Sequence, residues 1–202
     1  MLHLLRQDPQ IQIAGLLTTF NQQFDRVAMH AVRRKLAEAQ AQAAALPLRA
    51  IPLPWPCPNE RYGAIMAEVC RAAVADGIEA IAFGDLFLAD IRAYREKQLA
   101  GTRLEPLFPL WQIPTPQLAR DMIRGGLRAR LTCVDPRVLG REFAGREFDE
   151  KLLADLPPSV DPCGENGEFH SFVYDGPMFQ NPIAIQPGEI VDRDGFVFAD
   201  FE

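Results

Sequence analysis

The chain has 202 residues, a length that fits one large domain or two small ones with an ample core. Hydrophobic residues make up 48% and charged residues 24%, as is usual for a globular protein in water. The net charge of −6, without a Lys/Arg cluster on one periodic face, argues against a surface that binds nucleic acid through its phosphates.

The cysteines and the apolar segments indicate the compartment. Cys57, Cys70, Cys133 and Cys163 form no C-x-x-C pair and fit no zinc spacing, so we expect reduced thiols in a cytoplasmic protein. No apolar run approaches the ~20 residues of a membrane helix, and the first residues do not read as a signal peptide. We therefore expect neither a nucleic acid nor a membrane as a partner.

The first 111 residues alternate predicted strands with predicted helices after an uncapped helical opening at Met1–Arg6. Apolar runs predict strands at 11–19, 48–53, 78–83 and 104–111. Periodic apolar residues predict helices at about 24–45, 59–75 and 86–100, the first with an inner face of Met29, Val32, Leu36, Ala39 and Ala43. This alternation indicates parallel strands joined by helical crossovers, an α/β fold.

Ligands of parallel sheets bind beyond the carboxyl ends of the strands. In this chain those ends are residues 18–21, the loop Pro52–Pro58 and Gly84–Asp85. We expect His30, one residue off the apolar stripe of its helix, to be a structural residue.

After Trp111 the pattern changes. Thr115 is predicted to cap a short helix that has Pro116 at its first position and ends at Gly125–Gly126, and a strand alternates over 127–134. A helix is predicted at 149–156, and Asp194–Gly195 predicts a two-residue hairpin turn. The second half is therefore predicted to be α+β with a mixed or antiparallel sheet, and we place the domain boundary near residue 111.

The segment Gly-Glu-Asn-Gly-Glu-Phe-His-Ser at 164–171 carries the densest group of residues capable of catalysis. Two glycines can take positive φ values, which allows a tight loop that holds polar side chains together. A strand-like run begins at Glu168, so Glu168 and His170 should share one face, about 7 Å apart along the chain. Asp161 and Glu165 lie just upstream.

Several stretches together resemble the diphthine–ammonia ligase family, the diphthamide synthetases of the N-type ATP pyrophosphatase group. They are residues 16–21 with 25–30, 83–88 with 90–92, 108–111, and, most specifically, 161–170 with 175–177. The resemblance implies a Rossmann-like (HUP-type, adenine nucleotide alpha hydrolase-like) parallel-sheet nucleotide domain at 1–111 and a smaller α+β substrate domain at 112–202.

In this family, ATP with Mg²⁺ activates the diphthine carboxylate as an acyl-adenylate, and ammonia displaces AMP to leave an amide. The resemblance implies as partners ammonia and a carboxylate substrate, small or protein-borne; in archaea and eukaryotes this is diphthine on a histidine of the translocation elongation factor. The sequence leaves open whether the protein forms a homodimer.

The family's site residues carry over to matching positions. Those on the catalytic side would be Glu165, Glu168 and His170. Substrate binding would fall to Gly164, Asn166, Gly167 and Ser171, with the Gly164 and Gly167 backbone amides as donors. Nucleotide binding would fall to Thr19, Asn21, Gly84 and Asp85, and no permanent metal site is expected.

One departure concerns the phosphates. The family begins with a strand and a Ser-Gly-Gly-Lys-Asp-Ser loop that wraps the ATP phosphates, and here Met1–Leu5 resembles the first helix beyond that loop. We expect a start displaced from the true one, and weak ATP binding and slow turnover for these 202 residues. Arg92 and Arg95 could contact the departing pyrophosphate or simply form an exposed helix face.

Other interpretations stay open. Residues 164–171 could be a polar loop with a structural His170, and Asp85 could be only a helix cap. The chain could be another ATP pyrophosphatase, with a different carboxylate or RNA substrate. It could also be a binding module without catalysis.

Overall fold

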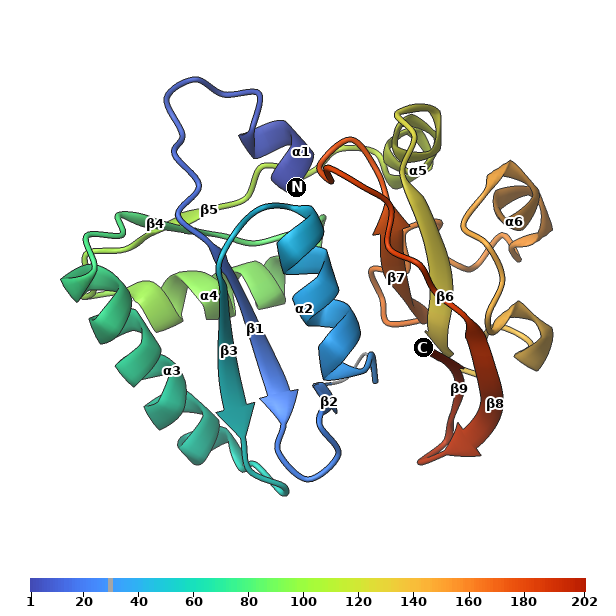
Figure 1. Ribbon diagram of the computed structural model, residues 1–202, viewed down its shortest axis with the longest axis horizontal. Helices are drawn as coiled ribbons and strands as arrows, with labels where there is room; N and C mark the ends of the chain where they lie inside the picture. Colours follow the sequence, from blue (N-terminus) through green and yellow to red (C-terminus); the bar gives the residue numbers. More distant parts are fainter. Residues whose placement is uncertain (29–30) are drawn as a thin grey trace. The chain divides into compact units, whose positions relative to one another are not determined.

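The computed structural model describes residues 1–28 and 31–202 and divides into two compact units. Unit 1 comprises residues 1–14 and 53–113, and unit 2 comprises residues 15–52 and 114–202 (Figure 1). The chain enters unit 2 for the second time close to the boundary that we placed near residue 111. Residues 15–52, which we assigned to the first domain, group with unit 2 instead. The predicted roles of Met29 and His30 lie outside the described residues.

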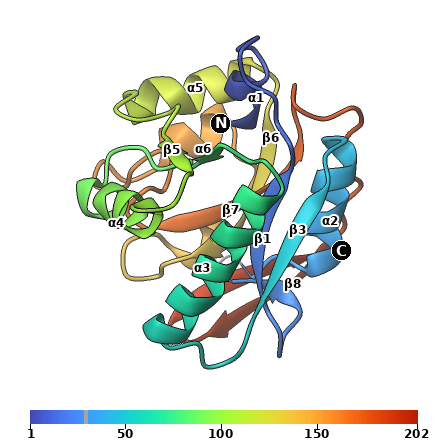
Figure 2. The same cartoon turned by 90° about the vertical axis from the view of Figure 1, so that its left-hand side faces the viewer.

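Unit 1 contains the helices α1 (Leu2–Leu5), α3 (Asn59–Ala75) and α4 (Ala89–Leu99) and the strands β4 (Ala80–Ala82) and β5 (Glu105–Leu107). Figure 2 shows α3 with α4 beside it. The buried residues Cys70, Ala73, Leu99 and Leu104 form a small core between these elements. The helix predicted at 59–75 is thus confirmed, with Pro58 at its N-cap position, and the helix predicted at 86–100 forms over Ala89–Leu99.

The two strands of unit 1 pair in parallel, as predicted, with Ala80 opposite Glu105 and Ala82 opposite Leu107. Both are shorter than the predicted runs 78–83 and 104–111. Pro109 lies two residues beyond β5, and proline cannot donate to a ladder, whereas Pro106 lies inside β5 opposite Ile81. The hydrogen bonds from Glu105 N–H to Glu79 O and from Phe83 N–H to Leu107 O extend the pairing at each end.

Unit 2 begins with the strands β1 (Leu16–Asn21), β2 (Arg26–Val27) and β3 (Leu48–Leu53) and the helix α2 (Arg34–Ala43). The strands form one sheet in the order β2-β1-β3, and β1 and β3 point the same way (Figure 1). The strand predicted at 11–19 starts later than expected, and Ile11 and Ile13 precede it.

The helix predicted at 24–45 is wrong over the described residues before α2, which are 24–28 and 31–33. Asn21 accepts hydrogen bonds at its Oδ1 from Gln23 N–H and Phe24 N–H, which turns the chain back after β1. Asp25 and Ala31 have φ values of 50° and 55°, a left-handed conformation that no α-helix contains. The chain therefore forms a hairpin, in which β2 pairs antiparallel with β1, before α2 begins.

An ion-pair cluster fastens this hairpin to the end of the chain. The Asp200 carboxylate forms ion pairs with the guanidinium groups of Arg26, at 2.8 Å, and Arg33, at 2.5 Å. Arg33 also forms an ion pair with Glu202 at 2.7 Å. Burial alone would raise the pKa of Asp200, but the hydrogen bonds from Arg33 and Arg26 outweigh it and lower this pKa well below its usual value. These contacts help to explain why residues 15–52 group with the C-terminal segment.

The rest of unit 2 follows the predicted order closely. Its helices are α5 (Thr115–Arg124) and α6 (Glu150–Asp155), with a short 3-10 helix η1 (Arg141–Phe143), and its strands are β6 (Arg128–Val134), β7 (Phe169–Asp175), β8 (Pro187–Arg193) and β9 (Phe196–Phe201). The strands form an antiparallel sheet in the order β7-β6-β9-β8. The predicted hairpin turn at Asp194–Gly195 is confirmed, with φ values of 52° and 82°.

The main core of unit 2 joins this sheet to α5 and α6. Leu131, Val134 and Leu152 are fully buried in it. Val32, just before α2, and Leu36, in its first turn, belong to the same cluster. The chain is therefore a mixed α/β protein with both parallel and antiparallel strand pairs.

Candidate functional site

The loop that precedes β7 is organised by the carboxylate of Glu168. This residue is only 5% exposed. Its Oε1 accepts hydrogen bonds from the Asp161 N–H and the Asn166 side-chain amide, both at 2.9 Å, and its Oε2 accepts one from the Asn166 N–H at 3.0 Å. Glu168 thus closes the loop on itself, because a buried carboxylate needs such donors.

A second carboxylate holds the other side of the loop. Asp161 Oδ2 accepts hydrogen bonds from the N–H groups of Cys163 and Glu165, both at 3.0 Å. Asp161 Oδ1 accepts a hydrogen bond from the Thr115 hydroxyl at 2.5 Å. We expected Thr115 to cap α5, but Pro114 stands at the N-cap position and the Thr115 side chain anchors the loop instead.

The two glycines of the loop have the positive φ values that the sequence predicts, 71° for Gly164 and 86° for Gly167. A Cβ on Gly164 would also lie 2.7 Å from the carbonyl oxygen of Phe169, whereas one on Gly167 would meet open space. The Gly164 N–H donates to Asp161 O, and the Gly167 N–H donates to Gly164 O. These two amides, which we expected to face substrate, are used inside the loop in this structure.

His170 and Ser171 lie half-buried at the start of β7. They are opposite Cys133 and Leu131 of β6, and the register shifts by one residue between those two partners. The extra residue is Thr132, whose hydroxyl donates to His170 O at 3.3 Å. Bulges of this kind redirect neighbouring side chains and are frequent beside functional sites.

A further carboxylate, Asp135, lies next to this loop and was missed by the sequence analysis. Its N–H donates to the carbonyl oxygen of Glu168 at 2.9 Å, which extends the β6–β7 pairing by one residue. Asp135 is 7% exposed and binds the guanidinium of Arg137 at 2.6 Å. Hydrogen bonds from Arg137 lower the pKa of Asp135, against the opposing effect of burial. The Asp-Pro pair directly after a predicted strand was the available signal.

The thiols near the loop are unreactive groups. Burial, with the charges of Asp161 and Glu165, raises the pKa of Cys163 to about 12. Burial, with the charge of Asp135, raises the pKa of Cys133 to about 11. Since the thiolate is the nucleophile, neither cysteine is suited to covalent catalysis near neutral pH.

The candidate nucleotide-binding residues fall into two units, with Gly84 and Asp85 in unit 1 and Thr19 and Asn21 in unit 2. In unit 1, Gly84 and Asp85 follow β4. Asp85 does not stand at the start of α4, whose N-cap position is Leu88, so the cap-only interpretation does not describe this structure. In unit 2, Asn21 is the last residue of β1, and its Oδ1 accepts hydrogen bonds within the turn that follows. The carbonyl oxygen of Thr19 accepts a hydrogen bond from Ala28 N–H.

Asp85 faces Arg95 across 3.6 Å, too long for a hydrogen bond. Asp85 Oδ2 and Arg95 Nε are both buried without a hydrogen-bond partner in the described part of the chain. Arg92 lies over the rings of Phe108 and Trp111, at 4.7 and 4.8 Å. The two arginines are thus partly covered rather than forming a freely exposed face.

Comparison with known proteins addresses the C-terminal segment. Residues 115–198 match the family model of the diphthamide synthase C-terminal domain. This segment is therefore similar to the diphthamide synthase C-terminal domain. The predicted resemblance to the diphthine–ammonia ligase family is thereby confirmed over this part of the chain.

The chain is also similar to curated proteins named diphthine–ammonia ligase. The Schizosaccharomyces pombe protein is 32% identical over 120 residues, which is 57% of this chain and 20% of the relative. The human protein is 31% identical over 128 residues, or 60% of this chain and 48% of the relative. The zebrafish (Danio rerio) protein is 33% identical over 119 residues, or 55% and 46%. The chain therefore spans about half or less of the relatives that it matches.

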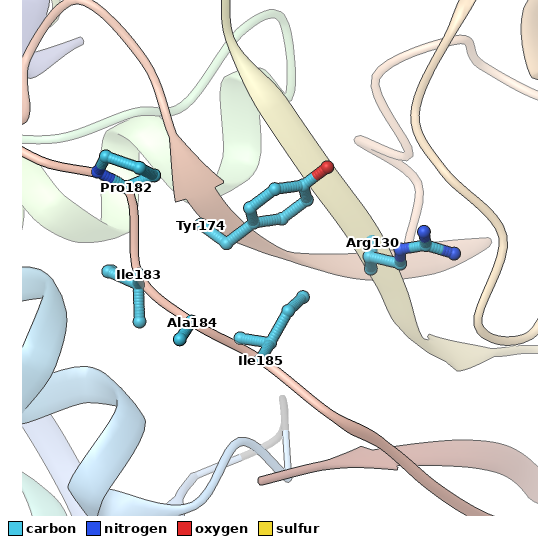
Figure 3. A pocket seen from close by; sticks show the side chains of 6 residues that line it. All are labelled: Arg130, Tyr174, Pro182, Ile183, Ala184 and Ile185. Atoms are coloured by element: carbon cyan, nitrogen blue, oxygen red, sulfur yellow. The ribbon is translucent and has the colours of Figure 1, made fainter.

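The segment that matches this family model contains every residue of the loop network, from Thr115 to His170, together with Asp135. It also contains a shallow pocket of about 360 Å³ that the sequence did not predict, lined by Arg130, Tyr174, Pro182, Ile183, Ala184 and Ile185 (Figure 3). The Tyr174 hydroxyl donates to Glu147 at 2.6 Å. Burial, followed by this hydrogen bond, raises the pKa of Tyr174 to about 12.

The pocket lies away from the loop. Tyr174 is four residues beyond His170 on β7, or about 13 Å along an extended strand. In the described residues, no three His, Cys, Asp or Glu side chains gather as a metal site, and none of the helices is long and apolar enough to cross a membrane.

Proposed function

We propose that unit 2 provides the substrate-binding part of an ATP-dependent carboxylate–ammonia ligase of the diphthine–ammonia ligase type. The observation that carries this proposal is the loop 161–168, closed by two carboxylates inside a segment that matches the diphthamide synthase C-terminal domain. The reaction would pass through an acyl-adenylate and release AMP and pyrophosphate.

The loop supports this role because it fixes the candidate catalytic residues before any substrate arrives. The Glu165 N–H is held by Asp161, and the Thr132 bulge fixes the backbone at His170. Sites that bind reacting groups need this kind of support from neighbouring hydrogen bonds. In the proposal, Glu165 and His170 contact the substrate carboxylate and move the proton of the attacking ammonia. Glu168 supports them by holding the loop, and Asn166 and Ser171 lie beside them.

The nucleotide part of the proposal rests on unit 1 and on residues 16–21. We infer a Rossmann-like domain that binds ATP with Mg²⁺. The parallel β4–β5 pair supports this fold, and the carboxyl end of such a pair is where ligands bind. Asp85 Oδ2 and Arg95 Nε, which have no hydrogen bond in the described residues, fit a polar ligand beside Gly84. When bound, ATP would supply the adenylyl group that activates the carboxylate. A cytoplasmic location and ammonia as nitrogen donor belong to the same proposal.

A single-turnover assay tests the proposal. The 202-residue chain is used in excess over an elongation factor that carries diphthine, with ATP, Mg²⁺ and ammonium. We expect AMP and a factor whose carboxylic acid has become an amide, detected by mass spectrometry. Hydroxylamine in place of ammonium should give the hydroxamate, because it traps the activated acyl group. Glu165→Gln and His170→Ala should each slow amide formation by about 100-fold, the lower range for loss of an acid or base.

The matched control is the same factor without diphthine, which should give no AMP above background. Amide formation that is unchanged in both variants would move the chemistry away from the loop. AMP formation that is independent of diphthine would favour another ATP pyrophosphatase with a different substrate. Binding of the factor without any AMP, even in a single turnover, would favour a binding module.

A further inference from the structure

The register of the C-terminal sheet places several side chains on one face. Val134 of β6 is opposite both Phe169 of β7 and Val197 of β9, and Cys133 is opposite both His170 and Phe198. Residues directly opposite in an antiparallel pair point to the same side of the sheet. His170, Cys133 and Phe198 therefore share one face, and the buried row of Phe169, Val134 and Val197 points to the other.

Asp135 belongs to the face that carries His170. Its N–H bond to Glu168 O shows that the β6–β7 pairing continues one residue past Val134. The same antiparallel step along β9 leads from Val197 to Phe196. Asp135 thus lies between the loop on one side and the partly exposed ring of Phe196 on the other, with Phe198 next along that strand at 6.4 Å between ring centroids.

Two arginine side chains lie over this face. The guanidinium of Arg137 lies on the Asp135 carboxylate at 2.6 Å and over the Phe196 ring at 6.0 Å. Arg193 lies over the Phe198 ring at 5.3 Å. The Asp135 side chain is 10% exposed and the Arg137 side chain 76% exposed. A carboxylate and an aromatic ring are therefore fixed in the protein, while the cation that they hold reaches them from solvent.

We propose that Asp135 and Phe196 form a subsite for a quaternary ammonium group of the substrate, with Arg137 occupying the subsite when substrate is absent. This inference rests on the proposed function. Diphthine carries a trimethylammonio group on the same carbon atom as its carboxylate. A trimethylammonio group has no N–H to donate, so a protein recognises it by a negative charge and by the faces of aromatic rings.

Geometry restricts where such a subsite can be. Because the cation and the reacting carboxylate share one carbon, the groups that bind them must lie within a side chain's reach of each other. Asp135 is hydrogen-bonded to Glu168, and its strand runs about 4.8 Å from the strand of His170. The pocket at Arg130 and Tyr174 is about 13 Å farther along β7, which is too far.

Two small probes test the subsite in the 202-residue chain. One is butanoate with a trimethylammonio group on its α-carbon, and the other is the same acid with an uncharged tert-butyl group of equal shape. Titration calorimetry measures both affinities. We expect the cationic probe to bind about tenfold more tightly than its uncharged isostere, as for a desolvated cation over a ring beside a carboxylate.

Three substitutions test which residues cause the difference in affinity between the cationic and the uncharged probe. Asp135→Asn keeps the side-chain oxygen that accepts the Arg137 N–H, and should remove the preference for the cationic probe. Phe196→Leu should reduce it about threefold, since the ring is lost and apolar contact is kept. Arg137→Gln should strengthen binding of the cationic probe by removing its competitor. Asp149→Asn, at the N-cap of α6, is the matched control and should change neither affinity, because asparagine caps a helix as well as aspartate does.

The outcomes separate this inference from the proposed function. Equal affinities for the two probes in the unchanged chain, with both probes bound, would overturn the cation subsite and leave a carboxylate site standing. A preference that survives Asp135→Asn, in a variant that unfolds at the same temperature as the unchanged chain, would also overturn it. Binding of neither probe, together with no amide formation on the diphthine-bearing factor, would overturn both proposals.

Discussion

The carboxylate of Glu168 bonds back to the N–H of Asp161 at 2.9 Å, across the seven residues that separate them. Through this bond and those to Asn166, a residue that we predicted to be catalytic supports the loop that carries the other candidates. The same loop receives Thr115 from α5 through Asp161, so the start of the domain and its most specific motif are held together.

Removal of the Glu168 carboxylate should therefore destabilise the protein. Glu168→Ala leaves two backbone N–H groups and the Asn166 amide without their acceptor, and should lower the free energy of unfolding by about 3 kcal/mol. Glu168→Gln keeps one acceptor and should cost about half as much. Urea unfolding measures both. Glu189→Gln, on the exposed strand β8, is the control and should stay within about 0.5 kcal/mol of the unchanged chain.

The two loop glycines should respond unequally to the same substitution. Gly167→Ala places a Cβ in open space and should cost about 1–2 kcal/mol, the cost of a left-handed conformation. Gly164→Ala adds a contact of 2.7 Å with Phe169 O to that cost, so it should be the more destabilising by at least about 1 kcal/mol. Equal shifts of the urea midpoint for the two variants would contradict the packing described for Gly164.

Stability should fall at alkaline pH. The pKa of Cys163 is raised from 9.0 to about 12 and that of Cys133 to about 11, both chiefly by burial. Between about pH 9 and these values the unfolded chain loses thiol protons that the folded chain retains, so the contribution present below pH 9 is lost as the pH rises. Urea unfolding from pH 8 to pH 11 measures the loss.

Cys163→Ala provides the control for that pH dependence. The variant should lose stability less steeply over the same range, because it lacks one of the thiols whose pKa is raised by folding. In the folded chain at pH 8, iodoacetamide should label Cys163 and Cys133 much more slowly than after unfolding. Rapid labelling of Cys163 in the folded chain would show that its thiol is not buried as described.

The predictable part of the fold is the part with strong local signals. The strand at 128–134, the helix predicted at 149–156 and the turn at Asp194–Gly195 formed as expected, since the signals for each lie within a few residues of sequence. The prediction of a helix over residues 24–28 and 31–33 failed because it rested on apolar spacing alone. The turn bonds of Asn21 compete with that spacing, and the link from Arg26 and Arg33 to Asp200 joins residues about 170 positions apart.

The site was predictable to a similar degree. The sequence located the loop and its two glycines, because motif and conformation are both local. It did not show that Glu168 supports the loop, or that Thr115 reaches Asp161 instead of capping its helix. Asp135 was missed because its importance comes from β6 and β7 pairing across more than 30 residues. Strand pairing of this kind is set by tertiary structure rather than by nearby sequence.

Asp85 offers a test of the nucleotide proposal within unit 1. Asp85→Asn should weaken the binding of ATP with Mg²⁺ by about tenfold, as expected for loss of one charge-assisted contact. It should change the free energy of unfolding by about 1 kcal/mol at most, because Asp85 Oδ2 accepts no hydrogen bond in the described residues and its ion pair with Arg95 is long, at 3.6 Å. Asp90→Asn, an exposed residue in the first turn of α4, is the control. Equal effects of the two changes on ATP affinity would remove Asp85 from the site.

The central claim is that the loop before β7 recognises a diphthine-type carboxylate, and one competition measurement tests it most directly. The affinity of the chain for an elongation factor that carries diphthine is compared with its affinity for the unmodified factor, in the unchanged chain and in His170→Ala. We predict at least a tenfold preference for the modified factor, lost in the variant while its unfolding midpoint stays the same. Equal binding of the two factors by the unchanged chain would contradict the claim.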